Sequence, residues 1–89
     1  MIVQFDKSFD KSLKKISDKK ILAKLKEIII ELEESTSILQ VANIVKLTGY
    51  KNYYRIRIGD YRLGIELIDE VKIRLILVAH RKEIYRKFP

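Results

Sequence analysis

The spacing of the apolar residues changes once along this chain, and that change restricts the fold more than any other feature. In the first half, apolar residues recur about every 3.6 residues, which is typical of helices that bury one face. From Tyr53 onward they alternate with polar residues, as in strands that bury one face. Helices followed by a run of strands predict an α+β domain rather than alternating βαβ units.

The first half predicts one short strand and two helices. Ile2–Phe5 is expected to be the strand, and Asp6 is expected to cap a first helix. Ser17 and Asp18 indicate a break and a new N-cap. The second helix has its apolar positions at Ile21, Leu22, Leu25, Ile28, Ile29 and Leu32. The segment after Ser35–Ser37 is ambiguous, with Ile44–Leu47 as a possible short strand.

The second half predicts two hairpins. Gly59-Asp60 has the composition of a two-residue turn, which would place Arg57 opposite Arg62. A three-residue turn at 69–71 would lead into the strand Lys72–His80 and place Glu66 opposite Arg74.

This register assigns the side chains to two faces of the sheet. The apolar face is expected to hold Leu63, Ile65, Leu67, Ile73, Leu75 and Leu77. The other face is expected to hold Arg55, Arg57, Arg62, Arg74 and His80. The sequence therefore predicts a single domain, residues 1–89, of order β-α-α-β-β-β. Its two N-terminal helices pack on one face of a small, antiparallel-dominated sheet, and the basic face stays open.

The positive charge is concentrated in the second half of the chain. Eight lysines and seven acidic residues give residues 1–40 a net charge of +1, whereas eleven basic and five acidic residues give 41–89 a net charge of +6. All six arginines lie in the second half. Arginine suits bidentate phosphate recognition, so a polyanionic partner is expected there. The early lysines, Lys7 to Lys26, are expected to form a solvated helix face.

Several classes of protein are disfavoured by composition. The chain has no cysteine and one histidine, so neither a disulfide framework nor a metal site is expected, and no cofactor is expected. No apolar run approaches the roughly 20 residues that span a bilayer. The N-terminus lacks the layout of a signal peptide. We expect a cytoplasmic protein without metal or membrane contact.

Two motifs resemble the RelE/ParE toxin superfamily, and its RelE branch most closely. The first is Lys46-Leu47-Thr48-Gly49 followed by Tyr54-Arg55-Ile56-Arg57-Ile58-Gly59-Asp60-Tyr61-Arg62. The second is Val78-Ala79-His80-Arg81-Lys82-Glu83-Ile84-Tyr85. The resemblance implies a bacterial toxin of a type II toxin–antitoxin system that cleaves mRNA, on the ribosome or free, and is paired with an acidic antitoxin.

The resemblance also implies roles for individual residues. Arg55 and Arg57 match the basic strand positions that hold RNA phosphates, and Arg62 matches the arginine that steadies the scissile phosphate. Arg81 and Tyr85 match the C-terminal catalytic residues, and His80 lies where some members have a histidine. Lys51 and Tyr53 belong to the expected RNA-binding surface, Tyr53 because it shares a face with Arg55.

Metal-free RNA cleavage also requires groups that accept and donate a proton. Arginine stays protonated near neutrality and is suited to charge stabilisation, whereas histidine is the side chain that ordinarily titrates there. The sequence therefore favours Arg62 as the phosphate clamp and His80 as the proton shuttle. Two alternatives stay open: a ParE-like toxin that binds DNA gyrase, and a catalytically inactive, antitoxin-binding relic of the same fold.

Overall fold

A computed structural model describes all 89 residues of the chain. The elements in chain order are β1 (Ile2–Phe5), α1 (Lys7–Leu13), α2 (Lys19–Glu34), the 3-10 helix η1 (Ile38–Gln40), β2 (Ile44–Lys46), β3 (Tyr53–Ile58), β4 (Tyr61–Asp69), β5 (Lys72–His80) and α3 (Arg81–Lys87). The predicted elements all occur in the predicted order, and the possible strand at Ile44–Leu47 is present as β2, so four strands rather than three follow the two helices. The short helices η1 and α3 are additions that the sequence pattern did not predict.

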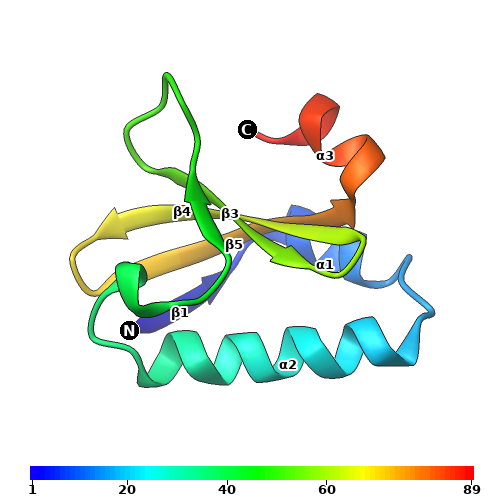
Figure 1. Cartoon of the computed structure of the whole chain (residues 1–89), viewed down its shortest axis with the longest axis horizontal. Coiled ribbons are helices and arrows are strands. Elements are labelled where there is room, and N and C mark those ends of the chain that lie inside the picture. Colours follow the sequence, from blue (N-terminus) through cyan, green and yellow to red (C-terminus); the bar gives the residue numbers. More distant parts are fainter.

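The five strands form one sheet in the order β1-β5-β4-β3-β2 (Figure 1). β1 runs parallel to β5, and the other neighbouring strands are antiparallel. Helices α1 and α2 cover one face of this sheet, whereas α3 lies on the other side (Figure 1). The α+β class with two helices on one face is therefore confirmed. The opposite face is not entirely open, because α3 covers part of it.

Helices α1 and α2 are each capped at the N-terminus, and one apolar layer packs them against the sheet. The Asp6 carboxylate accepts from the Ser8 backbone N–H at 3.1 Å, and Asp18 accepts from that of Lys20 at 2.9 Å, as predicted for N-caps. The main core buries Phe9, Ile16, Ile21, Leu25, Leu32, Ile38, Val41, Ile56, Ile58, Leu63, Ile65, Ile73, Leu75 and Val78. None of the helices has the length and apolar character needed to cross a membrane.

The cross-strand pairs predicted for both hairpins are confirmed, but the second turn has two residues, Glu70 and Val71, instead of three, and a register shift between Leu67 and Asp69 compensates for the difference. Arg57 pairs with Arg62 across the first hairpin, and Glu66 pairs with Arg74 across the second. Between them, however, the β4–β5 pairing shifts: Gly64 lies opposite Leu77, while the next residue, Ile65, lies opposite Leu75. This β-bulge places one extra residue on β5 and exchanges the faces of all residues beyond it.

Because of the bulge, two of the predicted side-chain positions are wrong. Leu77 was expected on the core face, but it packs on the opposite side, and Val78 takes its place in the main core opposite Leu63. His80 was expected beside the arginines, but it pairs with Tyr61 and follows the parity of Val78. A bulge adds one residue to one strand only, so the period-2 rule fails from that point onward.

Candidate active site

Three arginines and one tyrosine line a single cavity on the sheet face that α3 partly covers. Arg55 and Arg57 come from β3, Arg62 from the start of β4 and Tyr85 from α3. We call this cavity, of about 450 Å³, the arginine cleft. Its remaining lining residues are Asn43, Ile44 and Val45. The arginines meet because strand residues two apart share a face and because Arg57 and Arg62 are cross-strand partners.

Three contacts hold two of the arginines of the cleft in place. The guanidinium carbon of Arg55 lies 4.5 Å from the centre of the Tyr85 ring, a cation–π arrangement that joins β3 to α3. Arg62 donates from Nη1 to the backbone carbonyls of Gly59 and Tyr61, both at 2.9 Å. These bonds fix the Arg62 guanidinium at the hairpin end while its other nitrogens have no protein acceptor. Both arginines are thus oriented and still able to donate to a ligand.

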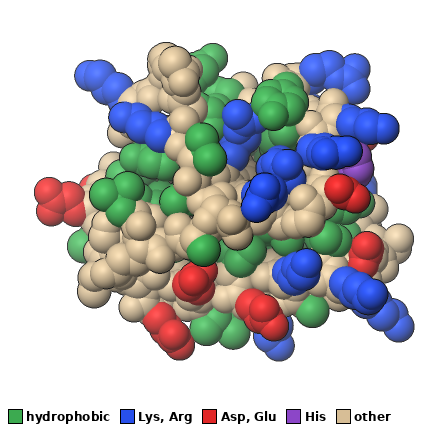
Figure 2. Space-filling view, in the orientation of Figure 1, with side chains coloured by type: hydrophobic (Ala, Val, Ile, Leu, Met, Phe, Trp, Pro, Cys, Tyr) green, Lys and Arg blue, Asp and Glu red, His purple; other side chains and the backbone are tan.

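No carboxylate neutralises the arginine cleft. The protein forms two ion pairs, Arg74–Glu66 at 3.9 Å and Lys87–Glu83 at 3.0 Å. Neither includes an arginine of the cleft, and the first confirms the predicted cross-strand pair. Arg57 instead donates to the Asn43 side chain at 3.4 Å. Figure 2 shows Lys and Arg side chains gathered over α3 and the nearby end of the sheet. The cleft is therefore a concentrated positive site that attracts anions.

A second apolar cluster fixes α3, and with it Tyr85. Ile84 and Phe88 are buried on the far face of the sheet from the main core, together with Leu47 and Ala79. The Phe88 ring packs edge-on against Tyr53, with the centroids 5.4 Å apart. It also lies directly over Gly64, where an added Cβ would be 2.6 Å from the ring. A glycine is required at this strand position because any side chain would displace Phe88.

His80 lies outside the arginine cleft and has a structural role. Its Nδ1 accepts from the backbone N–H of Lys82 at 3.2 Å, which makes His80 the N-cap of α3. Its ring packs edge-on against Tyr61, with the centroids 5.6 Å apart, on the side of the sheet that α1 covers. The interpretation of His80 as a neighbour of Arg57 and Arg62 was wrong, and the bulge is the reason.

The other predicted residues do not line the cleft. Arg81 is exposed at the first position of α3, one helical turn before Tyr85, and its backbone N–H donates to Asp60 at 2.7 Å. Lys51 is exposed in the loop before β3. Tyr53 does lie on the arginine face, but it is half-buried between Tyr50 and Phe88. These contacts give Tyr53 a packing role.

Sequence reasoning missed Asn43, Gly64 and Phe88. Ile84 and Phe88 are four residues apart with charged residues between them, which is the spacing of a short amphipathic helix. That spacing is compatible with α3, but one apolar pair does not by itself predict a helix. Asn43 has a positive φ of 61°, a conformation that asparagine tolerates, but only the fold brings it to Arg57.

Carboxyl groups with a lowered pKa lie away from the arginine cleft. The Ser8 hydroxyl donates to Asp6 and lowers the pKa of that carboxyl, and the Lys87 ammonium does the same for Glu83. No three His, Cys, Asp or Glu side chains come together in a group that could hold a metal ion. Among the residues that line the cleft, the ionisable side chains are the three guanidinium groups and the Tyr85 phenol.

Comparison with known proteins gives consistent matches. The family model of the ParE toxin of type II toxin–antitoxin systems matches residues 3–85. Toxin RelE3 of Methanocaldococcus jannaschii is 45% identical, and the alignment covers both chains completely.

Solved structures agree with this family. The toxin chain matched in the crystal structure of the RelB–RelE antitoxin–toxin complex from Methanococcus jannaschii is 43% identical, with a TM-score of 0.83 over 97% of this chain and 99% of that one. A chain of the intact Escherichia coli RelBE toxin–antitoxin complex is 30% identical, with a TM-score of 0.69 over 89% and 94% of the two chains. The chain therefore belongs to the RelE/ParE family of toxins from type II toxin–antitoxin systems.

Proposed function

We propose that this toxin is an endoribonuclease that cleaves mRNA in the arginine cleft without a metal ion. The observation that carries the proposal is the convergence of Arg55, Arg57 and Arg62 on one cavity with no carboxylate partner and with Tyr85 at its wall. RNA presents the matching chemistry, since it offers a row of phosphates and bases that stack on aromatic rings.

The reaction requires one phosphoryl transfer and two proton transfers. The 2′-oxygen of a ribose loses its proton and attacks the adjacent phosphorus, and the P–O5′ bond breaks as the leaving 5′-oxygen gains a proton. The products carry a 2′,3′-cyclic phosphate and a 5′-hydroxyl. Negative charge builds up on the phosphoryl oxygens in between, and fixed guanidinium groups stabilise it.

The geometry suggests how the residues divide this work. Arg62 is held by its two backbone hydrogen bonds and serves as the clamp on the scissile phosphate. Arg55 and Arg57 grip the phosphates of the strand. Tyr85 is the one lining residue besides the arginines with an ionisable side chain, so it takes the proton-transfer role for which the sequence favoured His80. Arg81, one turn earlier on α3, adds charge at the rim.

We also propose an acidic antitoxin as the partner, and the ribosome as the place where mRNA is cleaved. The relatives solved in complex with RelB support the first part. A net charge of +7 and an unneutralised cleft favour an acidic chain that covers the arginines.

Incubation of the purified protein with mRNA, with and without ribosomes, tests the activity. Cleavage to 2′,3′-cyclic phosphate ends is expected, and the double variant Arg55→Ala/Arg57→Ala should lose it while staying folded. Its RNA-binding salt slope should fall by about 0.7 for each lost phosphate contact. The control is Lys20→Ala/Lys24→Ala, which removes the same charge from α2. The absence of cleavage in both conditions would refute the proposal. It would favour one of the two alternatives, a toxin that binds DNA gyrase or a catalytically inactive protein that binds the antitoxin.

A further inference from the structure

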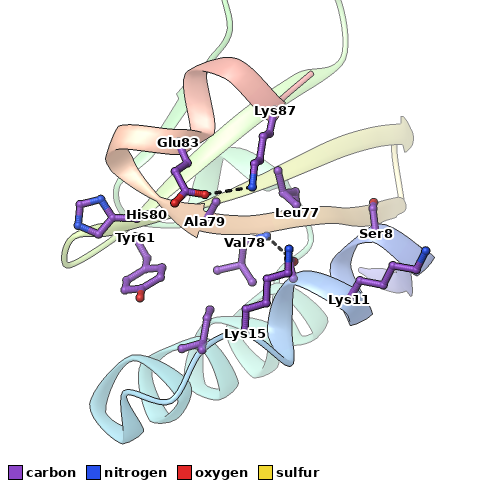
Figure 3. A pocket seen from close by; sticks show the side chains of 12 residues that line it. Ser8, Lys11, Lys15, Tyr61, Leu77, Val78, Ala79, His80, Glu83 and Lys87 are labelled. Carbon is purple, nitrogen blue, oxygen red and sulfur yellow. Dashed lines mark hydrogen bonds and ion pairs between the residues drawn. The ribbon is translucent and has the colours of Figure 1, made fainter.

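A second basic cavity lies on the α1 side of the sheet, away from the arginine cleft. Its volume is about 350 Å³, and Lys11, Lys15 and Lys87 line it (Figure 3). Ser8 and Ser12 add two hydroxyl groups to the wall. We call it the lysine pocket. Lys11 and Lys15 belong to the series that was expected to form a solvated helix face; both are exposed, and both side chains also border this cavity (Figure 3).

The charge of the lysine pocket is positive and only partly neutralised. Glu83 is the single carboxylate in the lining, and it is already paired with Lys87 at 3.0 Å. Lys11 and Lys15 form no ion pair and no hydrogen bond with their side chains. Three ammonium groups against one carboxylate leave an excess of two positive charges. An anion entering the pocket therefore meets two lysines without a competing partner.

Aromatic rings form one end of the same pocket. Tyr61 and His80 both line it, and their rings meet edge-on at an interplanar angle of 74°. Both side chains are half-buried, so part of each ring faces solvent. Ammonium groups beside a partly exposed aromatic pair are the combination that binds a nucleotide through its phosphate and its base.

The lysine pocket and the arginine cleft lie back to back at the end of one hairpin. Tyr61 lines the first and Arg62 lines the second, because consecutive strand residues point to opposite faces. The hairpin turn that separates them, Gly59-Asp60, is exposed. A single strand leaving the cleft can thus pass around this turn and reach the pocket without crossing the protein.

We propose that the lysine pocket binds a phosphate of the RNA strand that flanks the cleavage site, with Lys11 and Lys15 as its ligands and the Tyr61–His80 pair as a stacking surface. This inference rests on the proposed function and adds a second subsite to it. The enzyme would therefore bind longer RNA more tightly than the few nucleotides that the arginine cleft contacts.

The test compares two lengths of single-stranded RNA, about four and about twelve nucleotides, both with 2′-O-methyl riboses so that no cleavage occurs. Lys11→Ala/Lys15→Ala should bind the longer RNA about tenfold more weakly than the wild type at low salt and bind the shorter one equally well. Its salt slope with the longer RNA should fall by about 0.7 per lysine. Lys20→Ala/Lys24→Ala is the matched control, since it removes two lysines at the same i,i+4 spacing from α2 and neither lines the pocket.

The outcomes separate this inference from the proposed function. An equal loss in the control variant, a loss with both lengths, or no loss at all would overturn the lysine pocket as a subsite. Cleavage of unmodified RNA by the wild type is measured in parallel. Its absence would refute the proposed function, while a length-dependent loss of binding would still establish the pocket.

Discussion

One methyl group added at Gly64 tests whether the packing of the Phe88 ring over this glycine holds α3, and with it Tyr85, in position. In an ordinary strand, alanine in place of glycine stabilises the fold by about 0.5–1 kcal/mol, because glycine loses more backbone entropy on folding. Here the new Cβ would lie 2.6–2.7 Å from three atoms of the Phe88 ring, too close for any real contact. Overpacking of this kind costs about 1–3 kcal/mol. Expulsion of the ring costs a similar amount, about 1.5–3 kcal/mol.

The unfavourable effect is the larger one, so Gly64→Ala should be destabilised by about 1–2 kcal/mol. For a domain of this size the melting temperature should fall by roughly 5–15 °C. Displacement of Phe88 also moves α3 and takes Tyr85 away from Arg55, so RNA cleavage should fall further than the folded fraction does. Thermal unfolding by circular dichroism and cleavage at a temperature where the variant is fully folded measure the two effects.

A double-mutant cycle gives the decisive control. In the Phe88→Leu background the smaller side chain leaves room for a Cβ, so Gly64→Ala should cost much less there than in the wild type. If Gly64→Ala were as stable as the wild type, or more stable, the Phe88 ring could move aside without loss of stability. That result would refute the tight packing of Phe88 over Gly64 as a determinant of the fold. The same cost in both backgrounds would mean that the damage has another origin.

The remaining predictions concern Tyr85, His80 and Asp6. Tyr85→Phe keeps the ring over Arg55 and removes only the hydroxyl, so in a cleavage assay activity should fall about 10²–10⁴-fold with RNA affinity retained; near wild-type cleavage would exclude Tyr85 from proton transfer. His80→Asn keeps an N-cap but removes the ring, so it should retain the cleavage rate at saturating RNA and weaken binding only of RNA long enough to reach the lysine pocket, whereas His80→Ala should also lose about 0.5–2 kcal/mol of stability in urea unfolding; a large fall in the rate at saturating RNA in His80→Asn would restore the shuttle role. The pKa of Asp6 is lowered from 3.8 in the folded state, so its stabilising effect is present above that value and lost as the pH falls through the lower one. Urea unfolding of Asp6→Asn below about pH 4 should therefore depend less on pH than that of the wild type.

Local signals in the sequence were sufficient for most of the fold. Asp6 and Asp18 cap helices where predicted, because an N-cap depends only on its own side chain and the next turn. Gly59-Asp60 sets the first hairpin register for the same reason, since a two-residue turn determines which residues face each other. That register brought Arg57 and Arg62 together correctly, and with them most of the arginine cleft.

Features that depend on packing between distant segments were beyond the sequence pattern. Helix α3 is only seven residues long and is too short to be stable alone, so its apolar pair has meaning only against the sheet. The Phe88 ring at the end of this helix packs over Gly64. Glycine has no side chain, so the hydrophobic pattern gives no sign of this contact. The role of Phe88 follows from the close approach of these two residues, which are far apart in the chain.

The bulge in β5 links the errors about the fold to those about the site. A parity argument assumes an unbroken period of 2, and one extra residue near Gly64 exchanges the faces of everything that follows. His80 thereby moves to the α1 side, where it caps α3 and borders the lysine pocket, while Ala79 takes the position opposite Arg62. Ala79 is small enough for α3 to pack over that face. The same insertion that removes a histidine from the arginines therefore makes room for the helix that carries Tyr85 to them.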